Sequence, residues 1–297
     1  MELSNIANLL IISLVPMVPL LLGSVGEIVA EKAGVVNIGI EGIFLLSALT
    51  SAVVDFFTGN ILLAIMTGIV TGTALGILHG IISVYLRGDQ IVAGVGVNIL
   101  AYGLCVISLV TIWGTFGSSP PVKTVTKIRL LGSRISPLAF ISIAIAVATW
   151  YFLFKTNIGL RLRACGEDPR AAETMGVNVM RTRFLATIYG AMLAGLGGAY
   201  LSIDWVGQFT REIAAGRGFI ALANVAFSGW NPLTAIAGAF IFGFFEALSI
   251  YLSIRYGQFA LVYLFKTIPY LGTIAVTVIF VGRAKMPAAL GKPYIKE

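Results

Sequence analysis

The chain has 297 residues, of which 58% are hydrophobic and only 11% are charged, and its formal net charge is +7. Soluble domains carry about 25% charged residues, so this composition excludes a soluble globular protein and predicts an all-α, polytopic membrane protein. The positive charge is the bias expected of cytoplasmic loops between spans, and we expect no nucleic-acid binding.

Eight apolar stretches are each long enough, at about 20 residues, to cross a lipid bilayer as a helix. They cover residues 6–24, 35–54, 61–86, 90–113, 136–154, 184–203, 232–253 and 259–281. Two further apolar segments, 26–40 and 216–230, are interrupted by glycine and polar residues, and each is either a short crossing or a re-entrant helix. We therefore expect one transmembrane bundle over residues 1–297 with about eight to ten spans, and ten is favoured.

Lysine and arginine residues set the predicted orientation of these spans. They are frequent in loop 157–183 and in the tail after residue 282, so both are expected to face the cytoplasm of a cell-membrane protein. Ten crossings place the N-terminus inside and loop 115–133 outside. If segment 26–40 does not cross, the N-terminus moves outside, and the sequence leaves both arrangements open.

Glycine recurs at spacings that favour close helix packing. Small residues line one face of span 61–86 and one face of span 184–203, and we expect internal packing there rather than a subunit interface. They are Gly68, Gly72, Gly76 and Gly80, and then Gly190, Ala194 and Gly198. The segments GVVNIGIEG (34–42) and GFIALANVAFSG (218–229) are weakly similar, since each places glycine and asparagine in a short apolar segment before a full span. Paired interruptions of this kind point to a substrate route.

The polar loop 157–183 contains a short capped helix. Asp168 suits an N-cap, Pro169 suits the first helical position, and Gly176 suits the C-terminal exit. A helix of about two turns is not stable alone in water, so it should rest against something. With Ala171 and Ala172 as small accessible residues, it is interpreted as a docking element for a cytosolic partner.

Ionisable residues inside spans are costly and are candidates for function. They are Glu41, His79, Asp204, Glu246 and Lys266. Asp204 is expected at a solvated membrane boundary, His79 as a hydrogen-bonded packing residue, and Glu246 needs a partner. The sequence contains no catalytic motif, no metal-binding Cys/His cluster and no phosphate-binding loop, so we expect no enzyme activity and no bound cofactor, with any ATPase on another polypeptide.

Three stretches resemble one known family. They are PLLLGSVGEIVAEKAGVVNIGIEGIFLLSAL (19–49), NIGLRLRACGEDPRAAETMGVNV (157–179) and GRGFIALANVAFSGWNPLTAIAGAFIFGFFEAL (216–248). The chain is similar to the permease subunits of ABC importers for nucleosides and simple sugars, related to ribose and branched-chain amino acid permeases. It resembles the nucleoside-type branch most closely, although Ser228 stands where many members have glycine.

The resemblance implies a coupling helix, which seats in a groove of a separate ATP-binding subunit that holds ATP and Mg. The implied coupling residues are Glu167, Asp168, Pro169, Arg170, Ala171, Ala172, Glu173, Met175 and Gly176. It also implies a second, distinct permease subunit and an extracytoplasmic substrate-binding lipoprotein. The residues expected to line the substrate pathway are Asn37, Glu41, Asn224, Trp230 and Asn231.

Two other functions are compatible with a polytopic membrane protein. An ion-coupled secondary transporter would use Glu41, Glu246 or His79 as its coupling site, but such a carrier needs no docking element. A structural membrane subunit would need no interrupted segments, which a bilayer tolerates only beside a cavity or under protein cover. Both are weaker interpretations than the ATP-driven importer.

Overall fold

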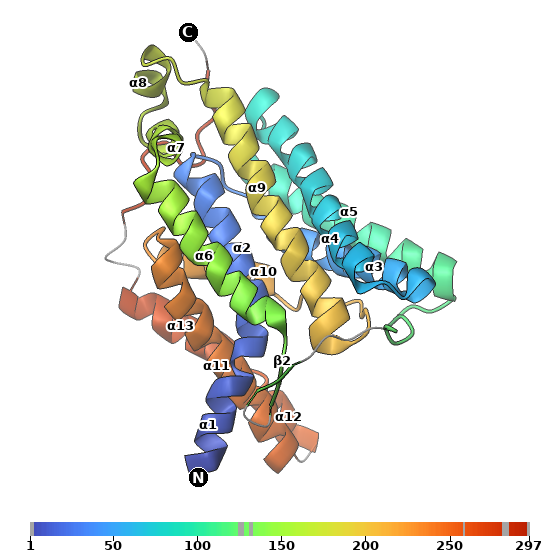
Figure 1. The fold of residues 1–297 in the computed structure, drawn as a ribbon. Coiled ribbons are helices and arrows are strands. Elements are labelled where there is room, and N and C mark those ends of the chain that lie inside the picture. The colour runs from blue at the N-terminus through green and yellow to red at the C-terminus, as the bar shows by residue number, and fades with distance from the viewer. Residues whose placement is uncertain (1–2, 124–127, 131–132, 258, 281–284, 296–297) are drawn as a thin grey trace.

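The computed structural model describes residues 3–123, 128–130, 133–257, 259–280 and 285–295. Its helices form an elongated bundle, with the start of α1 at one end and α8 at the other (Figure 1). In chain order the elements are α1 (Leu3–Ile12), α2 (Leu14–Lys32), α3 (Ile40–Thr58), α4 (Ile61–Gly80), the π-helix η1 (Ile81–Tyr85), α5 (Gln90–Trp113), β1 (Ile128–Leu130), β2 (Ser133–Ile135), α6 (Pro137–Lys155), α7 (Asn157–Glu167), α8 (Pro169–Thr174), α9 (Val179–Tyr200), the π-helix η2 (Leu201–Val206), α10 (Arg217–Phe227), α11 (Pro232–Tyr256), α12 (Phe259–Phe265) and α13 (Ile268–Phe280).

Polar caps mark where the apolar runs become helices. The side chain of Asn60 accepts a hydrogen bond from Leu62 N at 3.0 Å at the start of α4. Asp89 caps α5 through Ile91 N at 2.8 Å, and other elements begin in the same way. These caps satisfy amide groups that the first turn of a helix leaves without partners.

Seven helices in the described part of the chain are long and apolar enough to cross a membrane. They run over Asn8–Lys32, Ile40–Thr58, Ile61–Tyr85, Gln90–Trp113, Pro137–Lys155, Val179–Val206 and Pro232–Tyr256. The predicted polytopic helical bundle is confirmed, with one short antiparallel hairpin of β1 and β2 added. These seven helices of the described residues are fewer than the roughly eight to ten spans expected from the sequence.

Three segments account for the difference. Helix α2 continues unbroken to Lys32, so segment 26–40 is neither a crossing nor a re-entrant helix; a non-helical α2–α3 linker, residues 33–39, follows α2. The predicted span 259–281 is divided between Phe265 and Ile268 into α12 and α13. Helix α10 has 11 residues, and at about 1.5 Å per residue it covers about half of a hydrocarbon core that is about 30 Å thick.

The first helix and the last described segment begin and end at opposite ends of the bundle. Figure 1 places the start of α1 far from α7 and α8, whereas the C-terminal segment lies beside them. The favoured arrangement of ten crossings put the N-terminus on the same side as loop 157–183, and it is wrong. The other arrangement, in which residues 26–40 do not cross, agrees with the structure.

Helix α9 packs at backbone contact against two other helices. A Cβ atom on Gly72 of α4 would lie 2.4 Å from the carbonyl oxygen of Ala191, and one on Gly195 would lie 2.5 Å from that of Gly68. On another side, a Cβ atom on Gly26 of α2 would lie 2.5 Å from the carbonyl oxygen of Gly190. The glycine-rich faces therefore serve internal packing, as predicted.

The substitution Gly72→Ala tests this packing. The new methyl group must push α4 away from α9, and overpacking of this kind costs about 1–3 kcal/mol of stability. We expect a lower thermal unfolding midpoint for the purified protein. Gly96→Ala on α5 is the matched control, because nothing lies within 4 Å of its added Cβ atom. Equal midpoints for the two variants would contradict the packing role.

Candidate functional site

The α2–α3 linker begins with backbone hydrogen bonds from Ala33, Gly34 and Val35 to the last turn of α2, and side chains bind its backbone from Val36 onward. Val36 N donates to Gln90 Oε1 at 2.8 Å, and His79 Nε2 donates to Val36 O at 3.0 Å. Asn37 N donates to Glu27 Oε1 at 2.6 Å. Non-helical backbone at membrane depth persists only where protein groups satisfy it in this way.

Asn98 holds the far end of the linker. Its Nδ2 donates to Ile38 O at 3.1 Å, and its Oδ1 accepts from Gly42 N at 2.7 Å. Gln90 and Asn98 are eight residues apart on α5, which corresponds to about 12 Å along a helix. The linker therefore follows α5 from its first residue into the bundle, and α3 begins inside.

Glu41 joins α3 to α10 at the end of this linker. Its two carboxylate oxygens accept hydrogen bonds from Gly216 N and Gly218 N, both at 2.7 Å. A negative group is favoured at a helix N-terminus, so the carboxylate caps α10. A Cβ atom on Gly218 would lie 2.5 Å from Glu41 N, and therefore the approach requires glycine.

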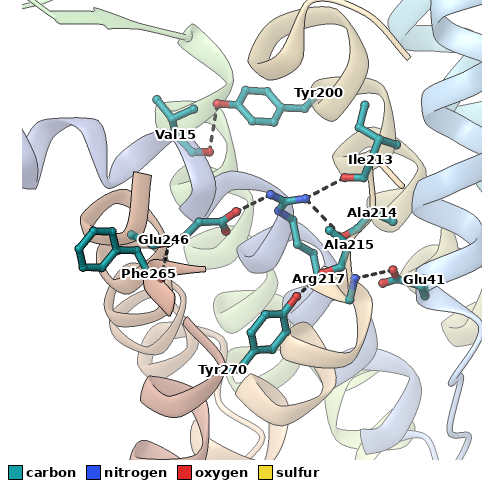
Figure 2. Close-up of polar contacts among 12 residues, drawn as sticks. Val15, Glu41, Tyr200, Ile213, Ala214, Ala215, Arg217, Glu246, Phe265 and Tyr270 are labelled. Carbon is teal, nitrogen blue, oxygen red and sulfur yellow. Dashed lines mark hydrogen bonds and ion pairs between the residues drawn. The ribbon is translucent and has the colours of Figure 1, made fainter. Parts of the chain in front are cut away.

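Arg217 forms the other side of the same junction (Figure 2). It makes an ion pair with Glu246 of α11, and both side chains are 14% exposed. Its guanidinium lies 4.3 Å from the ring centre of Trp205, and Nη1 donates to Ile213 O at 2.8 Å. Arg217 is the partner that Glu246 was predicted to need.

An open cleft of about 550 Å³ lies beside Glu41. Three half-exposed aromatic rings line it, and each comes from a different helix: Tyr102 (α5), Phe219 (α10) and Tyr270 (α13). A neighbouring cleft of about 390 Å³ is lined by Arg217 and Glu246 and shares Tyr270. The sequence did not single out these rings, because aromatic residues inside apolar helices carry no distinctive signal.

The other residues predicted to line the pathway bond within the protein. Asn37 and Asn224 are buried, and Asn224 Nδ2 donates to Ser24 Oγ at 2.9 Å and to Ala235 O at 3.1 Å. Asn231 caps α11 through Leu233 N at 3.0 Å. The structure thus places Glu41 on the cleft, whereas the Asn37 side chain accepts from the linker amide of Gly39 at 2.9 Å and Asn224 joins α10 to α2 and α11.

Trp230 follows α10 and is held by a carboxylate that sequence analysis missed. Its Nε1 donates to Glu31 Oε2, and its φ of 56° lies in the left-handed region. Glu31 and Glu27 are one helical turn apart near the end of α2, and both are buried. The four-residue spacing of two acids in an apolar run was the available signal.

The remaining ionisable candidates are either buried and hydrogen-bonded within the protein or exposed at its surface. His79 is fully buried and hydrogen-bonded to the linker, as predicted. Asp204 is 2% exposed and accepts a hydrogen bond from Ser136, so the expected solvated position is wrong. Lys266 is exposed between α12 and α13.

The capped helix of the polar loop is present as α8. Asp168 Oδ1 accepts from Arg170 N at 3.1 Å and from Ala171 N at 3.0 Å, Pro169 is the first helical residue, and Gly176 has φ 81°. Glu167, Asp168, Arg170, Ala171, Met175 and Gly176 are exposed, and Pro169 and Glu173 are partly buried.

Ala172 does not have the predicted accessibility. It is 4% exposed and packs with Cys165, Val179 and Tyr294 beneath α8. Burial raises the pKa of the Cys165 thiol above its ordinary value, although Thr182 and Arg183 act in the opposite direction. Cys165 is therefore a neutral packing residue, and Ala171 is the small residue that faces outward.

Residues 9–282 match the family described as the permease component of branched-chain amino acid transport systems. The guanosine ABC transporter permease protein NupQ of Bacillus subtilis (strain 168) is 36% identical over 96% of this chain and 95% of its own. The nucleoside ABC transporter permease protein NupC of Lactococcus lactis subsp. cremoris (strain MG1363) is 34% identical over 98% and 96%. The putative glucose ABC transporter permease protein TsgC13 of Haloferax volcanii is 34% identical over 78% and 73%. No solved structure matches this chain.

The family match extends from the first span through α13 and includes both the cleft and α8. It confirms the resemblance drawn from the sequence and does not favour an ion-coupled secondary transporter. The chain therefore belongs to the family of ABC importer permeases, in which it is a membrane-spanning subunit.

Proposed function

We propose that this permease moves nucleosides, and the observation that carries the proposal is the aromatic cleft beside Glu41. Its volume, about 550 Å³, lies in the range of small-molecule sites, about 300–1,000 Å³. Tyr102, Phe219 and Tyr270 offer faces on which a nucleobase stacks, and the Glu41 carboxylate accepts hydrogen bonds from hydroxyl groups. The names of NupQ and NupC agree with this substrate class.

The α8 end of the bundle faces the cytoplasm in this proposal. Arg161, Arg163 and Arg170 lie in α7 and α8, and Lys285 and Lys292 lie in the adjoining C-terminal segment. Positive charge of this kind marks the cytoplasmic side of membrane proteins. The exposed side of α8 then contacts a separate ATP-binding subunit, which carries ATP and Mg, while this chain binds no cofactor.

A second permease subunit, distinct from this chain, covers the cleft in the proposed transporter. Glu41, Arg211 and Glu212 border the cleft, and such groups are costly where they face lipid. An extracytoplasmic binding lipoprotein delivers the nucleoside to the end of the bundle opposite α8. Passage through the cleft then requires only brief contacts, because the binding protein selects the substrate.

The cleft is tested by Tyr102→Ala, measured as guanosine uptake into proteoliposomes that contain the complete transporter. Loss of one stacking face costs about 1–3 kcal/mol, so we expect the uptake rate to fall about tenfold. Tyr102→Phe keeps the ring and should retain most of the uptake. Tyr151→Ala, which removes an exposed ring from α6 outside the cleft, is the matched control. Full uptake by Tyr102→Ala and Phe219→Ala would contradict the nucleoside pathway.

Docking of α8 is tested by Ala171→Arg. The side chain of Ala171 is exposed, so the variant should retain its thermal stability but lose association with the ATP-binding subunit and nearly all uptake. Ala172→Arg should instead unfold the loop, because a charge without a partner would be buried. Gly117→Arg adds the same side chain at an open position on another loop, and it should leave association with the ATP-binding subunit unchanged. Normal association of Ala171→Arg would refute docking at this face.

A further inference from the structure

The C-terminal strap, residues 285–295, is anchored on α7 and in the core of the bundle. Ala289 N donates to Gly166 O at 2.9 Å, and Ala288 N donates to Glu167 Oε2 at 3.3 Å. Leu290 packs against the apolar cluster that includes Ile28, Leu162 and Trp230. The strap is therefore attached to the membrane helices and is not a loose tail.

Tyr294 attaches the strap to α8. Its ring is 8% exposed and packs against Ala172, and its hydroxyl donates a hydrogen bond to the Glu173 carboxylate. Tyr294 lines two open clefts of about 330 and 440 Å³, and it bridges the strap and the helix between them. A buried ring with a bonded hydroxyl fixes both distance and orientation.

Arg183 of α9 ties the strap to the loop beneath it. The side chain is 2% exposed, Nη1 donates to Lys292 O at 2.8 Å, and Nη2 donates to Cys165 O at 3.1 Å. Gly34 lies directly against this guanidinium, since a Cβ atom there would approach Nη2 to 2.6 Å. The Gly34 φ of 98° also requires glycine.

The strap also binds the α2–α3 linker. Gly291 N donates to Gly34 O at 3.3 Å, and Gly34 is the second residue of the linker that ends at α3 and Glu41. One set of contacts thus joins α8, through Tyr294, the strap and Gly34, to the segment that positions the cleft.

We propose that the C-terminal strap transmits movement of α8 to the α2–α3 linker, with Tyr294 and Arg183 as positioning residues for coupling. The proposal rests on the docking of α8 to the ATP-binding subunit and goes beyond it. Helix α8 has six residues and is too short to hold its shape alone. Without the strap, its displacement would be absorbed by the loop, whereas packed and hydrogen-bonded contacts transmit it.

The test compares Tyr294→Ala and Tyr294→Phe in the complete transporter reconstituted in proteoliposomes. Tyr294→Ala should still bind the ATP-binding subunit and hydrolyse ATP, but guanosine transported per ATP should fall about fivefold or more, the usual scale of coupling between sites. Tyr294→Phe removes only the hydroxyl and should give a smaller loss. Tyr256→Ala, which removes an exposed tyrosine of α11, is the control. An unchanged ratio for both Tyr294 variants would overturn the proposal.

Hydrogen exchange distinguishes transmission from local support of α8. In Tyr294→Ala we expect faster amide exchange at Val36 and Gly39, which follow Gly34 in the linker, as well as in the strap. Faster exchange confined to α8 and the strap would overturn the transmission step. If the wild-type complex transports no guanosine, that result contradicts the proposed substrate and not the role of the strap. The exchange measurement then still decides the role of the strap. If Tyr294→Ala folds poorly, the transport ratio and the amide exchange are both measured with Tyr294→Phe, and its results decide the proposal.

Discussion

The fold depends on how the polar backbone of the α2–α3 linker is satisfied among apolar helices. Glu27, His79, Gln90 and Asn98 come from three helices, and each binds a backbone group in or beside residues 33–39. An amide or carbonyl group left unpaired there would cost about 1–3 kcal/mol. This requirement explains why polar side chains occur at these positions in otherwise apolar helices, and why His79 needs no role in ion coupling.

The linker in turn determines where the cleft forms. Because Asn98 fixes both Ile38 and Gly42, the first turn of α3 begins inside the bundle and carries Glu41 to the N-terminus of α10. The glycine at position 218 allows the backbones to meet. Close packing of α9 against α2 and α4 supplies the rigid surroundings that such an arrangement needs.

Local signals in the sequence were sufficient for the fold class, the glycine packing and the capped α8, because each depends on neighbouring residues. The number of spans was not predictable in this way. Helix α2 passes through Gly26 and Glu27 without a break because tertiary packing covers them, and α12 and α13 separate within one apolar run. The roles of Glu31 and Tyr102 depend on contacts between segments that are distant in the sequence. A hydropathy pattern is a local property, so it does not predict such contacts. Ala172 is buried for the same reason, since the strap that covers it is over a hundred residues away.

The two ends of α10 are held by carboxylates on either side of the linker. Glu31, in the last turn of α2, accepts from Trp230 just after α10, and Glu41, in the first turn of α3, accepts from Gly216 and Gly218 at its start. A helix of 11 residues that is gripped at both ends moves as one body. A shift of the linker relative to α2 would therefore move the start of α10, carrying Phe219 in the wall of the cleft, while Trp230 stays with α2.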